Sequence, residues 1–466
     1  MRLSEGLVIP NWRGPFESVE YVLLLILLLS LYGEAFPYGI PLVLPVAVCG
    51  FAWFAFINRR LSLPLNLGFV LLQLCFAFYL LGIIHTSHIY ETNTRDLRNG
   101  LCVLLTSILL FCERTPLDFL LFRDKAQMTG ALAGTLLAVI GLYKFHLMAS
   151  GQMLQLLWVD GYKYPWGTSL TVDYNFYAFA ILCGAISCLF CFSKVSSIIA
   201  KVMYGAGFVL NIMSLSLSGS RRGWVTETVL LMAVLFILFR WIFLSLLCSR
   251  GGVFLSQQRL KALTAIVLLA AAGPILMEKY LAWFAENNHT DFESEKKDLQ
   301  FRFSTLSDPS ESFGPRISRW EFAAQLLDHA SPVELVFGQG FGYLDLFANS
   351  LNITRKHTEA ATWPEDYPHN PVISAALYSG VIGGVIVLSF ILLALFRYVK
   401  QRHIDVYFGI LYFASLWFIL PAYNSLFSGK FFGILMLIPW GMPPGGGAIV
   451  SVDRLRLRGP GGSVWS

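Results

Sequence analysis

The sequence is poor in charge. Charged residues make up 14% of its 466 residues, whereas soluble domains carry about 25%. Hydrophobic residues make up 56%, and the mean hydropathy is +0.62. A chain with so little charge and so many apolar side chains is not expected to form a soluble globular protein. The composition therefore predicts a protein that lies in a lipid bilayer.

The chain also has few cysteines, and its long polar loop has none. The eight lie in or beside apolar runs: Cys49, Cys75, Cys102, Cys112, Cys183, Cys188, Cys191 and Cys248. Neither a disulfide framework nor a thiolate metal site is indicated. No cluster of Asp or His has the spacing of metal ligands, so we expect no metal site and no cofactor. We expect no nucleic-acid partner either.

Two further signals are missing. The N-terminal segment MRLSEGLVIPNWRG lacks the compact basic region and short apolar run of a cleavable signal peptide, so none is expected. The glycines of FGQGFGYL, which are Gly338, Gly340 and Gly342, lack the flanking strand and helix of a dinucleotide-binding fingerprint. They predict instead a tight backbone turn packed on the membrane domain.

The sequence contains many long apolar runs. A membrane-spanning helix needs about 20 mostly apolar residues, and we count about 12 such runs. They lie near 18–36, 38–57, 63–86, 97–112, 127–148, 170–192, 202–219, 223–246, 262–278, 371–396, 405–423 and 430–448. The predicted fold class is an all-α polytopic integral membrane protein with one large, partly helical periplasmic loop.

Lysine and arginine in short loops predict the orientation, because such loops stay on the cytoplasmic side. The basic residues fall on alternate loops: Arg59, Arg60, Arg114, Arg123, Lys125, Lys194, Lys201, Arg240, Arg250, Arg259, Lys261, Arg397, Lys400 and Arg402. With about 12 spans, both termini are then cytoplasmic. The predicted organisation is residues 1–278 with the first nine spans, a periplasmic loop at 279–370, the last three spans at 371–448, and a disordered cytoplasmic tail at 449–466.

The large loop contains one helical pattern. In PRISRWEFAAQLLDHASP, Pro315 suits a first helical turn and Pro332 ends the pattern. The apolar residues Ile317, Trp320, Ala324 and Leu327 recur at helical spacing. We expect an amphipathic helix over 315–330.

Several arginines and one lysine lie on the outer side, where the charge rule predicts few. Arg221 and Arg222 lie in the turn before the eighth span, Arg95 and Arg98 open the fourth span, Lys163 precedes the sixth, and Arg316 and Arg319 belong to the loop helix. One such residue could extend its charge to the headgroups. As a set on one face, their forked donors suit phosphate oxygens. The pattern favours an anionic ligand, most simply a phosphate or pyrophosphate, at the outer leaflet.

Three other polar residues and a histidine share this face. Asp173 and Asn175 lie where the chain enters the sixth span, where they could bind a ligand or cap the helix. His369 lies where the large loop meets the tenth span, and Asn370 beside it could donate to a ligand. Imidazole is the commonest general base near neutral pH. His369 is therefore the candidate base, although a lone interfacial histidine is more often structural.

These motifs resemble a known family. HNPVISAALYSGVIG, from His369 to Gly383, has a histidine, an amide residue, nine spacers, a glycine, two spacers and a second glycine, which resembles the signature of bacterial O-antigen ligases. SGSRRGW, VDYN, and RISRW followed by LVFGQGFG resemble motifs of the wider ligase and polymerase superfamily. The match favours Arg221 over Arg222 and Arg316 over Arg319, but both arginines of each pair remain candidates. Arg95 and Arg98 match only loosely.

The resemblance implies a function. Members of the family move a polysaccharide from undecaprenyl diphosphate to a sugar hydroxyl of the lipid A core, at the outer face of the bacterial inner membrane. For this chain it implies a metal-independent, inverting transfer with His369 as general base and Arg221 and Arg316 as catalytic arginines. The implied substrate-binding residues are Arg222, Arg319, Asn370, Asp173, Asn175, Arg98 and Lys163.

Two alternatives remain open. An O-antigen polymerase would use the same arginines with a growing glycan as acceptor. A transporter or flippase of a lipid-linked glycan would also bind diphosphate, but it would need charged or titratable groups through the membrane, and these are scarce in the sequence.

Overall fold

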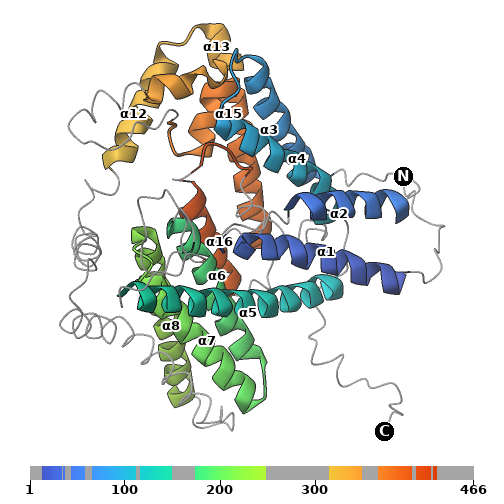
Figure 1. The fold of residues 1–466 in the computed structure, drawn as a ribbon, viewed down its shortest axis with the longest axis vertical. Helices are drawn as coiled ribbons and strands as arrows, with labels where there is room; N and C mark the ends of the chain where they lie inside the picture. The colour runs from blue at the N-terminus through green and yellow to red at the C-terminus, as the bar shows by residue number, and fades with distance from the viewer. Residues whose placement is uncertain are drawn as a thin grey trace.

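The computed structural model describes residues 13–33, 35–36, 43–57, 66–111, 116–149, 170, 174–247, 314–348, 366–400, 406–420 and 423–427. This part of the chain is mostly helical and contains no strand (Figure 1). The predicted spans at 262–278 and 430–448, much of the large loop and the tail at 449–466 lie outside these residues.

The described helices overlap the remaining predicted spans. They are α1 (Arg13–Gly33), α2 (Val43–Ile57), α3 (Leu67–Ile84), α4 (Glu91–Phe111), α5 (Pro116–Ala149), α6 (Tyr174–Lys194), α7 (Ile198–Ser216), α8 (Arg221–Leu247), α15 (Pro371–Lys400) and α16 (Val406–Ile419). Five stretches in this part of the chain are long and apolar enough to cross a bilayer: Leu67–Ile84, Leu121–Leu147, Tyr174–Lys194, Ile198–Ser216 and Pro371–Arg397. Length and composition thus support a polytopic membrane protein.

Several helices begin earlier than expected, and two of them, α4 and α8, carry predicted site residues in their first turns. α4 begins at Glu91 rather than near 97, so Arg95 and Arg98 lie within its first two turns. α8 begins at Arg221, which places Arg221 and Arg222 in the first helical turn rather than in a loop. Ser220 explains this start, because its Oγ accepts a hydrogen bond from Gly223 N (3.1 Å), as an N-cap residue does. A count of apolar residues misses such polar first turns.

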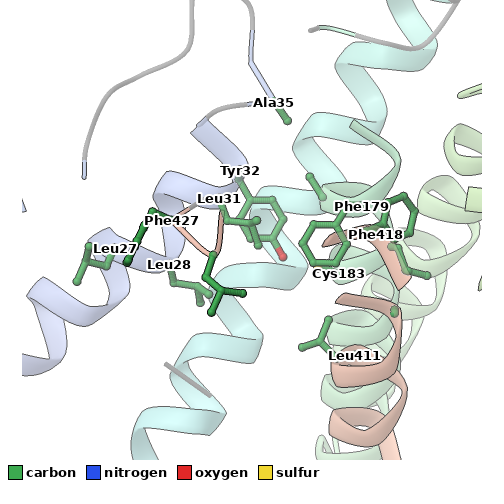
Figure 2. Packing of buried hydrophobic residues seen from close by; sticks show 14 of the residues in the cluster. Leu27, Leu28, Leu31, Tyr32, Ala35, Phe179, Cys183, Leu411, Phe418 and Phe427 are labelled. Carbon is green, nitrogen blue, oxygen red and sulfur yellow. The ribbon is translucent and has the colours of Figure 1, made fainter. Parts of the chain in front are cut away.

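The core is centred on α6, whose residues are almost all buried. It packs against α5, α7 and α16, and small residues allow the helices to approach closely. A Cβ added at Gly134 of α5 would overlap the backbone of Gly184 in α6. Figure 2 shows Phe179 and Cys183 of α6 together with Phe418 and Leu411 of α16 and Tyr32 of α1.

The helix expected over 315–330 is present as α12 (Gly314–Asp328). Its buried face differs from the expected one, because Ile317 is exposed while Arg319 and Ala323 are buried. Arg319 can be buried because an acidic partner neutralises it, as described below. The apolar pattern by itself could not reveal that pairing.

After α12, the short helix α13 (Pro332–Phe337) and the 3₁₀ turn η3 (Gly340–Gly342) cover the upper ends of α3 and α15 (Figure 1). The buried ring of Phe341 stacks on Tyr378 of α15, with ring centroids 4.5 Å apart. Phe341 N donates to Thr86 Oγ1 at the end of α3 (2.6 Å). The expected glycine turn packed on the membrane domain is therefore confirmed.

The glycine turn of the loop packs against a kink in α15. The helix breaks at Ser379 and Gly380, and Gly380 has φ +79°. Gln339 N donates to Leu377 O at the break (2.8 Å), so the loop supplies a donor to the interrupted helix. A Cβ at Gly380 would overlap Val336 O, and one at Gly338 would overlap the backbone of Tyr378 and Ser379. Gly380, the first glycine of the histidine motif, and Gly338 of the loop thus allow the backbones of α15 and the loop to touch.

Replacing Gly380 by Ala should therefore destabilise the protein by about 2 to 4 kcal/mol, because the added Cβ meets backbone and φ is positive. Gly342→Ala is the matched control, since nothing lies within 4 Å of its added Cβ. We expect a lower apparent melting temperature in detergent for Gly380→Ala and little change for Gly342→Ala. Equal melting of both variants would show that the contact does not hold α13 against α15.

Candidate functional site

The predicted site residues within the described part of the chain lie around the ends of several helices. Contacts join the first turn of α8 to the first turn of α6 through Ser220 and Asn175, and to the end of α16 through Arg222 and Phe418. The segment 366–370 precedes α15 and is tied to α12 by Arg319 and Trp320. The cited contacts therefore form two groups, one at the ends of α6, α8 and α16 and one between α12 and the segment before α15.

Asp366 joins the candidate base to α12. One of its carboxylate oxygens, Oδ1, lies 3.5 Å from His369 Nε2. The other, Oδ2, accepts a hydrogen bond from Arg319 Nη2 at 3.0 Å. Burial of Asp366 opposes its ionisation, but the contacts with His369 and Arg319 outweigh this effect and hold its pKa below the usual value. The three side chains form an Arg–Asp–His series with Asp366 in the ionised form.

The backbone holds His369 in an uncommon conformation. Its φ of +53° is the one positive φ at a non-glycine residue in the described part of the chain, and such outliers cluster at functional sites. Trp320 Nε1 donates to Pro368 O (3.0 Å), which fixes the preceding residue. The ring of Tyr367 lies 4.4 Å from the imidazole, measured between centroids. The side chain of His369 remains 29% exposed, so a substrate can reach it.

Asn370 caps α15. Its Oδ1 accepts hydrogen bonds from Val372 N (3.0 Å) and Ile373 N (3.2 Å), as an N-cap side chain does. The amide oxygen therefore stabilises the start of the helix. Asn370 of the histidine motif thus has a structural role as a helix cap, which the ligand-binding hypothesis did not include.

The arginines of α12 and α8 lie close enough to repel one another. Burial lowers the pKa of Arg316 to about 10, together with the like charges of Arg222, Arg319 and Arg221, and Tyr174 partly offsets the effect. Two segments almost a hundred residues apart in the sequence thus present their guanidinium groups to one region. An anion bound there would relieve the repulsion.

Within this group, Arg222 and Arg319 each have a protein partner. Arg222 Nη1 donates to Phe418 O at the end of α16 (3.1 Å), where a helix leaves carbonyls unsatisfied. Arg319 pairs with Asp366. These contacts give both residues a structural use.

The remaining predicted site residues have different surroundings. Asn175 Oδ1 accepts a hydrogen bond from Ser220 Oγ (2.8 Å), which places it at the start of α8. Arg98 is exposed on α4, and no described contact ties it to His369 or to the arginines of α8 and α12. Asp173 and Lys163 lie outside the described residues.

Arg95 approaches the site from α4. It lies 3.7 Å from Asp96, whose Oδ2 accepts a hydrogen bond from Ser425 Oγ (2.6 Å). The guanidinium also interacts electrostatically with Tyr367, next to His369 in sequence, and with Tyr423. A loose motif match had given Arg95 little weight, and the structure places it beside the segment that carries His369.

Sequence reasoning did not assign roles to Asp366, Trp320 and Tyr367 in the site. The signal for Asp366 was present, because an acidic residue three positions before a candidate base is within reach of it in a tight turn. Trp320 was interpreted as part of an apolar stripe, yet its indole nitrogen also contacts the segment of His369. Among the described residues, no group of three or more His, Cys, Asp or Glu side chains could hold a metal ion.

The arrangement offers an imidazole, a carboxylate beside it and a group of arginines, and side chains of these kinds can serve transfer from a phosphorylated donor. Residues 206–388, which include α8, α12 and the histidine motif, match the family model described as O-antigen ligase. No curated protein matches the chain. This match supports the O-antigen ligase and polymerase superfamily for residues 206–388, and members of that family are glycosyltransferase-like enzymes that act on lipid-linked glycans.

Proposed function

We propose that this protein is an O-antigen ligase. It transfers O-antigen polysaccharide from undecaprenyl diphosphate to a sugar hydroxyl of lipid A core, which completes lipopolysaccharide. Two observations support the proposal: Asp366 lies beside His369 and is bound by Arg319 of α12, and Arg316 of α12 lies within electrostatic reach of the arginines that begin α8. A base and a diphosphate-binding group are both required for this reaction.

The proposed reaction is a single displacement. His369 removes the proton of the acceptor hydroxyl, and the oxygen forms a bond to the anomeric carbon of the donor. The bond from that carbon to the diphosphate breaks, and its electron pair leaves with the diphosphate oxygen. Arg221 and Arg316 stabilise the charge that develops there. The configuration at the anomeric carbon inverts.

The proposed location follows from the charge pattern of the loops. The protein lies in the bacterial inner membrane with the site facing the periplasm and both termini in the cytoplasm. Both proposed substrates have a lipid part in the membrane and a glycan outside it. A site at the outer ends of the helices suits such substrates.

Purified protein with a defined undecaprenyl diphosphate glycan tests the proposal. The reaction is offered lipid A core in one arm and a second lipid-linked glycan in the other. Transfer to lipid A core supports a ligase, whereas transfer to the lipid-linked glycan alone would identify a polymerase. Movement of the donor across a vesicle membrane without transfer would identify a flippase.

We also predict that transfer continues after divalent metal ions are removed. The arginines can supply the positive charge that a metal ion supplies at a leaving diphosphate. The measurement is the transfer rate in excess EDTA, compared with the rate after magnesium or manganese is added. A rate that collapses in EDTA and returns with metal would contradict the prediction and make Asp173 the first candidate ligand.

A further inference from the structure

Asp366 contacts both the candidate base and an arginine of the loop helix. We infer that Asp366 is a positioning residue that orients His369 and stabilises its protonated form, and that Arg319 holds Asp366 in place rather than binding the donor diphosphate. The inference rests on the proposed role of His369 as base. It implies that α12 helps to position His369 through Arg319 and Asp366, which no motif of the sequence indicated.

Two hydrogen bonds fix the position of the Asp366 carboxylate. Arg319 Nη2 holds Oδ2 at 3.0 Å, and Tyr367 N donates to Oδ1 at 2.8 Å. The Asp366 side chain is 10% exposed and that of Arg319 is 9% exposed, so water screens their interaction little. The carboxylate therefore has little freedom to turn away from His369.

The orientation of the imidazole follows from this contact. Nε2 is the ring nitrogen that faces Asp366 Oδ1. In the neutral ring, the proton is then held on Nε2, and Nδ1 is the nitrogen that takes the proton of the acceptor. When that proton arrives, the positive ring lies beside a negative carboxylate, which stabilises it.

Among the described residues, charged and titratable side chains from several segments lie near the imidazole. Asp366 and Tyr367 come from its own segment, and Arg319 comes from α12. Arg95 of α4 and Tyr343 interact with Tyr367 and so act at a greater distance. Asp366 favours the protonated ring, whereas Arg319 and Arg95 disfavour it. The effects of removing Asp366 and Arg319 on His369 should therefore have opposite signs.

Asp366→Asn tests the inference with almost no change of shape. We expect kcat to fall by about 10²-fold, a part of what a positioned base contributes, with the donor KM unchanged. The ascending limb of the pH–rate profile should move to lower pH by about one unit, because the positive ring has lost its carboxylate. A merely structural role would lower the rate without moving the limb.

Arg319→Met provides the opposite test. Loss of the contact that holds Asp366 should lower kcat, and removal of the positive charge should move the ascending limb to higher pH, with the donor KM again unchanged. Arg319→Lys should restore part of the rate, because it keeps the charge but loses the forked geometry. Glu321→Gln, at an exposed position of the same helix, is the matched control and should leave rate and profile unchanged. A donor KM raised about tenfold or more in Arg319→Met would return Arg319 to the diphosphate site and overturn the inference.

A second readout does not depend on transfer. Diethyl pyrocarbonate modifies neutral imidazole, and mass spectrometry measures the extent of its reaction at His369 as a function of pH. We expect the profile to move to lower pH in Asp366→Asn and to higher pH in Arg319→Met. Unchanged profiles in both variants would overturn the inference even if the protein is a ligase. Absence of transfer by the wild-type protein would instead refute the proposed function.

Discussion

His369→Ala is expected to abolish glycan transfer and to leave the protein folded and inserted in the membrane. The reason is that His369 is the partly exposed imidazole beside Asp366 and is the candidate acceptor of the proton of a sugar hydroxyl. A positioned general base contributes about 10² to 10⁴ in rate. The measurement is transfer from a defined undecaprenyl diphosphate glycan to lipid A core, with the amount of folded protein determined by size exclusion in detergent.

The positive φ of His369 makes a second variant useful. Asn adopts the left-handed region more readily than Ala does, so His369→Asn keeps the turn but provides no base. We expect both variants to be inactive and His369→Asn to be the more stable of the two. If His369→Asn transfers glycan at the wild-type rate, the imidazole serves the structure of the turn and is not the base.

Weaker donor binding is the second large effect, and it is expected for Arg221→Ala and Arg316→Ala. Each lost charged hydrogen bond costs about 1.5 to 3 kcal/mol, which corresponds to binding weaker by about 10- to 100-fold. Lysine at either position should restore binding only in part, because it lacks the fork of the guanidinium. Binding is measured with a soluble prenyl diphosphate, so that the result does not depend on the acceptor.

The depressed pKa of Arg316 adds a test without substrate. A pKa of about 10 means that the folded protein disfavours the charged form of Arg316. At neutral pH the side chain is charged, so this cost fully reduces the stability of the folded state. Arg316→Gln should therefore raise the apparent melting temperature of the ligand-free protein. It should also abolish the stabilisation that pyrophosphate gives to the wild type.

A basic residue away from the site provides the control. Lys201 lies in the first turn of α7, at the end of that helix remote from Ser216 and α8, and Lys201→Gln should change neither binding nor the effect of pyrophosphate. If Arg221→Ala and Arg316→Ala bind the prenyl diphosphate as the wild type does, these arginines are not part of the donor site.

Much of this protein could be predicted from local sequence signals. Apolar runs predicted most helices because a bilayer imposes a minimum length and composition on each span. Pro315 and Pro332 bracketed α12 closely, since proline acts on the backbone of its immediate neighbours. The polar first turns of α4 and α8 were missed because hydropathy does not detect a capped helical turn.

The sequence by itself indicated a helical membrane protein and identified its candidate base and arginines, because composition, spacing and motif order are properties of the chain alone. Only the tertiary structure decided which of these residues meet. It paired Arg319 with Asp366, Arg222 with the end of α16, and Gly380 with the loop of α13. Such pairs join segments far apart in the chain, and the strength of a charge contact depends on distance and burial, which no single stretch of sequence contains.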